Sequence, residues 1–238
     1  MGPWLQAGQV DVAYTTPELA DQDIPNMELV ALESIDNRGI VLPYVSKQGK
    51  NQLGFEVGNN VTSDIASRRA LSYGIDREVL VEEVLNGYGS SPTGEELGIK
   101  INIEGTSWDI IAQDMYKDAV LMGWGAQNPL ETYLLYHRDN MGRDYYNPEN
   151  FSHERVDYYI DQAMSARDLE ESYQYWKKVQ WDGETGVATQ GECPWVWLVN
   201  VDHLYFVREG LDIGKQKIHP HGHAWPLVAN LKDWKWNP

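Results

Sequence analysis

Runs of β-branched residues alternate with segments of helical hydrophobic spacing through the middle of this chain, and this alternation restricts its fold most. Val and Ile recur between short polar breaks in several runs, which predicts strands. These runs are 27–34, 39–45, 99–105 and 119–125. Because strands and helices alternate along the chain, we predict an α/β fold in which helices flank a mixed sheet.

One long helix is expected between the second and third of these strands. From Ser63 to Asn86 apolar residues recur at helical spacing. Ser63 or Asp64 is placed to cap its start, and Gly87 is placed to stop it. The Gly, Ser and Pro content of 86–98 then predicts a loop.

Shorter elements are expected in the rest of the chain. Segment 108–118 is a predicted helix, and 126–140 is a turn that opens another. Two further helices are expected to pack as a pair. The first runs through Val156, Ile160 and Met164, and the second begins at Asp168 with Glu171 in capping-box position.

The chain is expected to end in strands and turns. The β-rich run 193–207 is predicted to form two strands that separate near Asp202 and His203. At the start, a short helix ending at Gly8 and a strand through Tyr14 are expected, and 223–238 is expected to form short strand and turn.

Composition excludes several classes of partner. The chain has 36 Asp and Glu against 19 Lys and Arg, a net charge of -17, which repels a phosphate backbone or an anionic membrane. No apolar run approaches the roughly 20 residues of a membrane span, and the first residues lack a signal-peptide pattern, so we expect a soluble globular protein. Cys193 is the single cysteine, which excludes an internal disulfide and a Cys-based zinc cluster, and we expect it buried.

The aromatic residues are unusual in type. The chain has 10 Trp and 14 Tyr but only 3 Phe. Trp and Tyr combine an apolar face with a polar edge, which suits cavities for partly polar ligands, although many of them are expected to fill the core.

The stretch SRRALSYGIDREVLVEEVLNGYG resembles the extracellular solute-binding proteins of the peptide/nickel family (family 5), which feed ABC importers. Its most specific part is Gly74, Ile75, Asp76 and Arg77. The stretches LQAGQVDVAY, LGIKINIEGTSWD and VLMGWGAQNPLETYL resemble other parts of the same family. The resemblance therefore covers most of the chain.

Members of that family enclose a ligand between two lobes joined by crossing strands. The resemblance implies a type II periplasmic-binding-protein-like lobe, incomplete relative to the bilobed family. We expect residues 1–37 to belong to lobe one, 38–224 to form the second ligand-binding lobe, shortened near 90–98, and 225–238 to return to lobe one. A half-cleft of this kind buries only one side of a ligand.

The resemblance also implies ligand-contacting residues in GWGAQNP. Trp124 is the first candidate, either as a stacking surface or as an N–H donor, with a core position beneath the turn as the alternative. Peptide-binding members carry an Asp in this turn that pairs with the α-amine of the peptide. Here Gln127 or Asn128 occupies that region, and a neutral amide cannot neutralise an ammonium.

The helix that follows supplies more candidates. Tyr133, Tyr136, His137 and Arg138 are expected near the ligand, with Tyr133 and His137 on one helix face. Arg138 could clamp a carboxylate. The alternative is a surface ion pair with Asp139 or Asp144.

The stretch IHPHGHAW raises the question of a metal site. In an extended backbone His219, His221 and His223 project from one side, and neutral imidazole suits nickel, copper and zinc. The surrounding segment also resembles a nickel-binding subgroup. Pro220 and Gly222 interrupt a regular strand, so we expect one of the three rings to reach a metal, with hinge residues as the alternative. His153 and His203 are expected to be structural.

These observations predict the substrate-binding component of an ABC importer, which binds a small solute such as nickel or a nickel chelate and delivers it to a permease. An oligopeptide- or dipeptide-binding protein of the same family is the alternative. Other classes are an acid/base hydrolase using carboxylates such as Glu95, Asp109 or Asp139, and an aromatic-rich carbohydrate-binding module. We expect no catalysis, no required cofactor, a monomer, no nucleic-acid partner, and a periplasmic or lipid-anchored cell-surface location.

Overall fold

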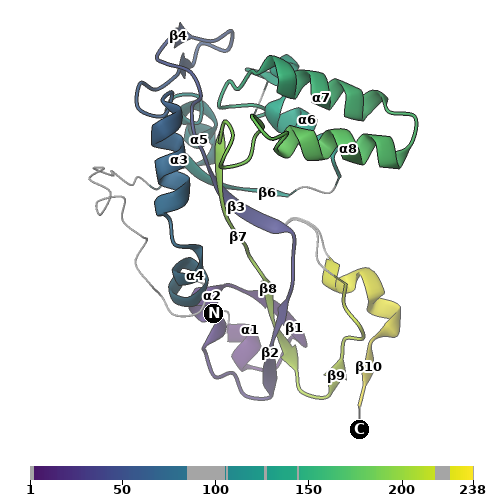
Figure 1. The fold of residues 1–238 in the computed structure, drawn as a ribbon. Helices are drawn as coiled ribbons and strands as arrows, with labels where there is room; N and C mark the ends of the chain where they lie inside the picture. The colour runs from purple at the N-terminus through teal and green to yellow at the C-terminus, as the bar shows by residue number, and fades with distance from the viewer. Residues whose placement is uncertain are drawn as a thin grey trace.

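The computed structural model describes residues 3–84, 105, 107–125, 128–143, 145–217 and 226–237. Within these residues the chain forms two lobes, each built around its own three-stranded antiparallel sheet (Figure 1). The larger lobe carries most of the helices and the main core, and the smaller lobe contains both the first and the last strands. No helix in this described part is long and apolar enough to cross a bilayer.

The larger lobe is organised around the sheet β6-β3-β7. Its strands are β6 Val120–Gly125, β3 Asp36–Val41 and β7 Trp195–Asn200. Residues of β3 and β7 alternate between two apolar clusters, as expected for a strand buried on both faces. Val41 and Trp195 belong to the main core, whereas Leu42, Cys193 and Val196 pack on the side of helix α3 (Ile65–Gly74). The predicted burial of Cys193 is confirmed.

Helix α3 is shorter than predicted. Asp64 caps its start by accepting a hydrogen bond from the backbone N–H of Ala66. The expected continuous helix from Ser63 to Asn86 is wrong, because Ile75 adopts an extended backbone and Asp76 begins a second helix by accepting from two backbone N–H groups. That second segment consists of α4 (Arg77–Val79) and the π-helical turn η1 (Leu80–Val84).

Two arginines, Arg68 of α3 and Arg77 of α4, attach their helices to the rest of the larger lobe. Arg68 is 1% exposed, and it donates to the carbonyls of Thr62 and Glu192 while its guanidinium lies 4.4 Å from the centre of the Tyr44 ring. Burial lowers the pKa of Arg68. Arg77 donates from Nε to the carbonyl of Trp197 at 2.8 Å. The motif that carries the family resemblance therefore has a structural role in this chain.

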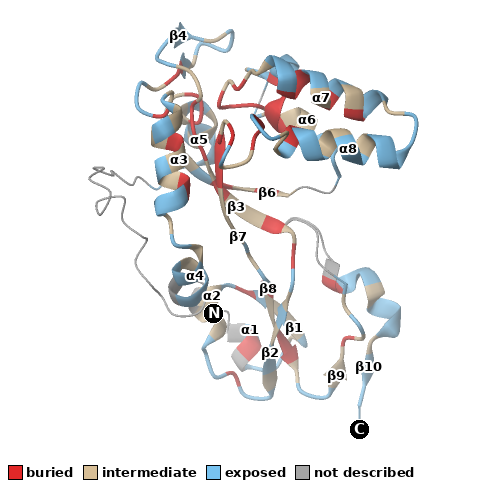
Figure 2. Cartoon of the chain, viewed as in Figure 1, coloured by how far each residue is buried: buried red, intermediate tan, exposed pale blue. Residues whose placement is uncertain are grey.

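Helices cover the opposite face of the sheet (Figures 1 and 2). They are α5 Trp108–Asp114, α6 Leu130–Tyr136, α7 Glu154–Ser165 and α8 Leu169–Gln180. The predicted α7 and α8 pair is confirmed, and Asp168 caps α8 by accepting from the N–H of Glu171. Met164 was expected on the buried face, but it is exposed and Ala163 is buried in its place.

The larger lobe also contains three short elements. They are the hairpin β4 Gly49–Lys50 and β5 Glu56–Val57, and the 3-10 turn η3 Arg138–Asn140. The strand expected at 99–105 falls outside the described residues except for Gly105.

The smaller lobe is organised around the sheet β1-β8-β2. Its elements are α1 Pro3–Gln6, β1 Val12–Thr15, α2 Pro17–Ala20, β2 Met27–Leu32, β8 His203–Arg208, β9 Leu211–Asp212, η4 Pro226–Asp233 and β10 Lys235–Trp236. Because β8 pairs with β1 and β2, the expected second lobe at 38–224 includes a strand that belongs with the N-terminal strands. The lobe boundary on that side lies near 201–202.

The C-terminal segment differs from its prediction. In the described residues 226–237, the 3-10 helix η4 was not predicted, whereas the short strand β10 agrees with the predicted strand. Pro226 is favoured at the first helical position, and Leu227 is buried against Val207 and Ile213, so packing holds this segment in helical form.

Candidate functional site

Two short crossing segments, 33–35 and 201–202, join the lobes where β2 leads into β3 and β7 leads into β8 (Figure 1). Ser34 Oγ donates to the carbonyl of Val201 at 2.6 Å, and the N–H of Val201 donates to the carbonyl of Asp36 at 2.8 Å. The two segments are therefore hydrogen-bonded to each other.

Charged side chains reinforce this junction. The Asp36 carboxylate bonds to the Arg38 guanidinium, and its Oδ2 lies 3.4 Å from His203 Nε2. Asp36 and His203 are only 4% and 3% exposed. His203 is thus structural, as expected, but it has an acidic partner that the sequence did not indicate. We call Ser34, Asp36, Arg38 and His203 the junction cluster.

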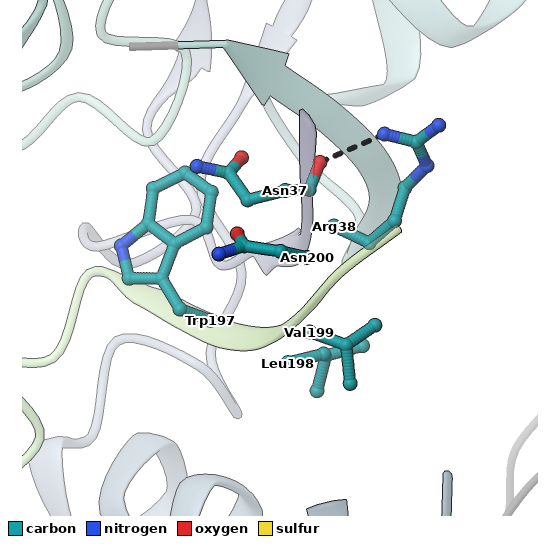
Figure 3. Close-up of a pocket in the computed structure, with 6 residues that line it drawn as sticks. All are labelled: Asn37, Arg38, Trp197, Leu198, Val199 and Asn200. Atoms are coloured by element: carbon teal, nitrogen blue, oxygen red, sulfur yellow. Dashed lines mark hydrogen bonds between the residues drawn. The ribbon is translucent and has the colours of Figure 1, made fainter. Parts of the chain in front are cut away.

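A pocket of about 230 Å³ adjoins the junction cluster at the end of the larger lobe's sheet (Figure 3). Its lining residues come from β3 and β7: Asn37, Arg38, Trp197, Leu198, Val199 and Asn200. In Figure 3 the amide groups of Asn37 and Asn200 lie on the same side as the Trp197 ring, whereas the Arg38 side chain extends the other way.

The strand register places three polar groups in one row. Asn37 on β3 lies directly opposite Trp124 on β6 and opposite Asn200 on β7. The side-chain oxygen of Asn37 accepts from the backbone N–H of Trp124 at 3.2 Å, which fixes the orientation of the Asn37 amide. We call Trp124, Asn37 and Asn200 the amide row.

Trp197 forms the aromatic wall of the pocket. It stacks on Trp195 with ring centroids 4.5 Å apart, and its Nε1 donates to Tyr136 Oη at 3.1 Å. A Cβ atom at Gly39 would lie only 2.7 Å from Trp197 Cε3, so the ring packs directly over a residue that has no side chain. The strand register shifts between Arg38 and Gly39, at the same level.

Tyr136 was predicted to face the ligand, and the structure places it beneath Trp197. It is buried, its ring meets Phe151 edge to face, and burial raises the pKa of its hydroxyl. Its contact with the pocket is therefore indirect, through the hydrogen bond to the Trp197 indole.

Trp124, the first candidate, is 8% exposed and belongs to the main core. Its ring packs against Tyr145 at 5.8 Å and Tyr146 at 6.0 Å, and Tyr145 in turn meets Trp108 at 6.3 Å. Its indole Nε1 is buried with no hydrogen-bond acceptor among the described residues. A role in ligand contact stays a prediction.

The turn before α6 contains one candidate that the structure describes. The side chain of Asn128 accepts from the N–H of Leu130 at 2.9 Å, so it is engaged in the turn that precedes α6. Gln127 lies outside the described residues.

Helix α6 directs its other candidates into a local cluster. Tyr133 and His137 stack with centroids 4.9 Å apart, which confirms their shared face. Nδ1 of the buried His137 accepts from the N–H of Asp139, and its Nε2 lies 3.4 Å from Asp161.

Arg138 pairs with an acid that was not among those expected for it, and of the two expected acids Asp144 lies outside the described residues. Its Nε donates to Asp157 Oδ2 at 2.5 Å, and this bond raises the pKa of Arg138. Asp157 lies one helix away, on α7, so the sequence offered no local sign of the pair.

The predicted metal ligands His219, His221 and His223 lie outside the described residues. Within the described part, no group of three His, Cys, Asp or Glu side chains has an arrangement that could hold a metal ion.

Sequence reasoning missed several residues at the junction. Asn37, Trp197 and Asn200 line the pocket, and Tyr14 of the smaller lobe is 63% exposed beside His203. The alternation of Trp195 and Trp197 in β7 was a usable signal for one face of a strand.

No family model matches the chain. Among curated proteins, protein XP55 of Streptomyces lividans is 21% identical over 283 residues, which covers 87% of this chain and 48% of that protein. The chain thus spans about half the length of this curated relative.

Solved structures match nearly the whole chain. NikZ from Campylobacter jejuni, in complex with Ni(L-His), is 16% identical with a TM-score of 0.63, covering 98% of this chain and 59% of NikZ. The oligopeptide-binding protein AppA from Bacillus subtilis, in complex with a nonapeptide, is 15% identical with a TM-score of 0.62, covering 99% and 58%. AgaA from A. tumefaciens R10, in complex with agropinic acid, is 13% identical with a TM-score of 0.65, covering 99% and 58%. The predicted α/β binding-protein fold is confirmed, and it is partial relative to these chains.

Proposed function

We propose that this chain is part of the substrate-binding component of an ABC importer and binds a small solute at the junction between its lobes. The observation that carries the proposal is the pocket beside the crossing segments, formed by polar and aromatic residues of β3 and β7. Hinge closure around a ligand is a recurrent device in such bilobed proteins, and the bonded segments 33–35 and 201–202 suit a hinge.

The fold neighbours support a solute-binding role but do not favour one solute. Their own ligands are a nickel–histidine complex, a nonapeptide and agropinic acid. We propose nickel or a nickel chelate as the transported solute, with one or more of His219, His221 and His223 as ligands. An oligopeptide is an equally supported alternative.

The remaining assignments follow from the same role. A binding component of this type acts outside the cytoplasm, in the periplasm or at the cell surface, as a monomer that presents its solute to a membrane permease. It performs no catalysis, and a bound metal would be cargo rather than a resident cofactor.

Isothermal titration calorimetry tests the proposal. The full chain is titrated with nickel sulfate, with nickel plus L-histidine, and with a nonapeptide. A variant with His219, His221 and His223 all changed to Ala tests the metal ligands. His153→Ala is the matched control, because His153 lies at the start of α7, away from the junction.

Each outcome assigns or removes a solute class. The nickel assignment is supported if nickel plus histidine gives saturable heat with the unmodified chain and with His153→Ala, and if the triple variant loses that heat. Saturable heat with the nonapeptide alone supports the peptide alternative. If none of the three titrations saturates, the solute-binding role of this chain is contradicted.

A further inference from the structure

The residues around the junction pocket select a particular type of ligand group. The chain carries 36 Asp and Glu against 19 Lys and Arg. The lining of this pocket includes no Asp or Glu, and its one charged residue is Arg38. The pocket lining is thus free of carboxylates in a chain that is acidic overall.

The carboxylate next to the pocket residues in the sequence of β3 is already engaged. Asp36 precedes the pocket residues on β3, but its oxygens face the Arg38 guanidinium and the His203 ring. It is also 4% exposed. The lining of the pocket therefore offers a ligand ammonium no carboxylate.

The amide of Asn37 is oriented as a donor toward the pocket. Its oxygen already accepts from the backbone N–H of Trp124 at 3.2 Å. Its nitrogen donates to no group in the part of the chain that the structure describes, and the same holds for the side-chain nitrogen of Asn200. Both amides therefore keep N–H donors for a ligand acceptor.

A third N–H donor belongs to the same row. Trp124 Nε1 is buried and has no acceptor among the described residues. Buried N–H groups without partners are rare, because the lost hydrogen bond with water is not replaced. Trp124 belongs to the main core and is not among the residues that line the pocket, so its indole N–H neighbours the Asn37 and Asn200 donors only through the strand register.

We infer that the side-chain amides of Asn37 and Asn200 bind a carboxylate or carbonyl group of the solute, and that this site does not recognise a free amine. The inference rests on the proposed solute-binding function and specifies the ligand end that the larger lobe takes. It applies to a chelated metal with outward carboxylates and to a peptide held by its C-terminal end.

Two probes that differ only at their ends test this inference. N-acetyl-Ala-Ala has a carboxylate and no amine, whereas Ala-Ala-amide has an amine and no carboxylate. Binding of each to the full chain is followed through the Asn side-chain and Trp indole N–H resonances in ¹⁵N-correlated NMR spectra, which detect weak complexes. We expect N-acetyl-Ala-Ala to bind about tenfold more tightly, as one charge-assisted hydrogen bond provides.

Asn37→Asp is the critical variant. The new carboxylate can still accept from the N–H of Trp124, but it replaces the free donor with a negative charge. We expect it to weaken N-acetyl-Ala-Ala by about tenfold and to improve Ala-Ala-amide. Asn60→Asp is the control, because it adds the same charge at an exposed site where Asn60 Oδ1 only accepts from Lys47 N.

The outcomes separate this inference from the proposed function. Equal or tighter binding of Ala-Ala-amide to the unmodified chain would overturn the inference while leaving solute binding intact. An Asn37→Asp variant that behaves like Asn60→Asp would also overturn it. If neither probe shifts any resonance at millimolar concentration while nickel–histidine or the nonapeptide gives saturable heat, the inference alone fails. If nothing binds, both fail.

Discussion

Glu149 provides the sharpest physical prediction about this fold. Its side chain is fully buried, and its Oε1 accepts from Trp195 Nε1 at 3.1 Å. Its other oxygen has no hydrogen-bond partner in the described part of the chain. Burial raises the pKa of this carboxyl well above its ordinary value, and the bond from Trp195 only partly offsets the effect. We therefore expect a protonated Glu149 in the folded protein.

The pH dependence follows from the direction of that shift. Unfolded chains release the proton above the ordinary carboxyl pKa of about 4.3, while the folded chain retains it. Above that pH the unfolded state thus binds fewer protons, and the free energy of unfolding falls by about 1.4 kcal/mol per pH unit until the raised pKa is passed. The contribution of protonated Glu149 to the free energy of unfolding is therefore largest at low pH and is lost as the pH rises.

Glu149→Gln isolates this effect. Glutamine keeps an oxygen acceptor for the Trp195 indole but has no proton to lose. The unfolding free energy of the variant minus that of the unmodified chain should therefore rise by about 1.4 kcal/mol per pH unit. Other titrating groups cancel in this difference.

Urea unfolding of both proteins at several pH values between about pH 5 and about pH 7 measures it. Glu209→Gln, at an exposed glutamate, is the control and should give a constant difference. A constant difference for Glu149→Gln as well would refute the argument.

Three further predictions concern packing and capping. Gly39→Ala should destabilise the fold by about 1–3 kcal/mol, because the new Cβ would lie 2.7 Å from Trp197 Cε3. Urea unfolding measures the loss, and an unchanged midpoint would show that the Trp197 ring can move aside. Arg68→Met should lower the free energy of unfolding by about 3 kcal/mol, because it removes a guanidinium that is 1% exposed and bonded to backbone carbonyls. Calorimetry should show a clear fall in Tm, and an unchanged Tm would contradict the stabilising role of Arg68. Asp168→Ala should lower the free energy of unfolding by about 1 kcal/mol, because it removes the side chain that accepts from the N–H of Glu171 at the start of α8. An unfolding free energy equal to that of the unmodified chain in urea would show that this cap contributes nothing.

The sequence located most elements but missed the polar end of the central strand. It predicted a strand at 39–45, whereas β3 is Asp36–Val41. Asp and Asn are uncommon in strands, so strand propensity does not indicate Asp36 and Asn37 as part of this strand. Their side chains instead meet Arg38 and the backbone N–H of Trp124, which lie on the same or neighbouring strands of the folded sheet. The candidate site lies at these missed residues.

Other differences also come from contacts distant in sequence. Arg138 pairs with Asp157 on the next helix, and His203 meets Asp36, 167 residues away. Periodicity describes which face of an element is apolar, but it carries no information about such partners. By contrast, α7 and α8 were predicted well because local spacing and the Asp168 cap determine them.

The central claim is that a solute binds at the junction of the two lobes. Hydrogen–deuterium exchange of the full chain, with and without nickel plus histidine or the nonapeptide, tests it most directly. We expect one solute to slow exchange in both β3 and β7 at the pocket, from Asn37 to Gly39 and from Trp197 to Asn200. Slowing confined to the distant pocket around Asn59 and Lys117, or no slowing with either solute, would contradict it.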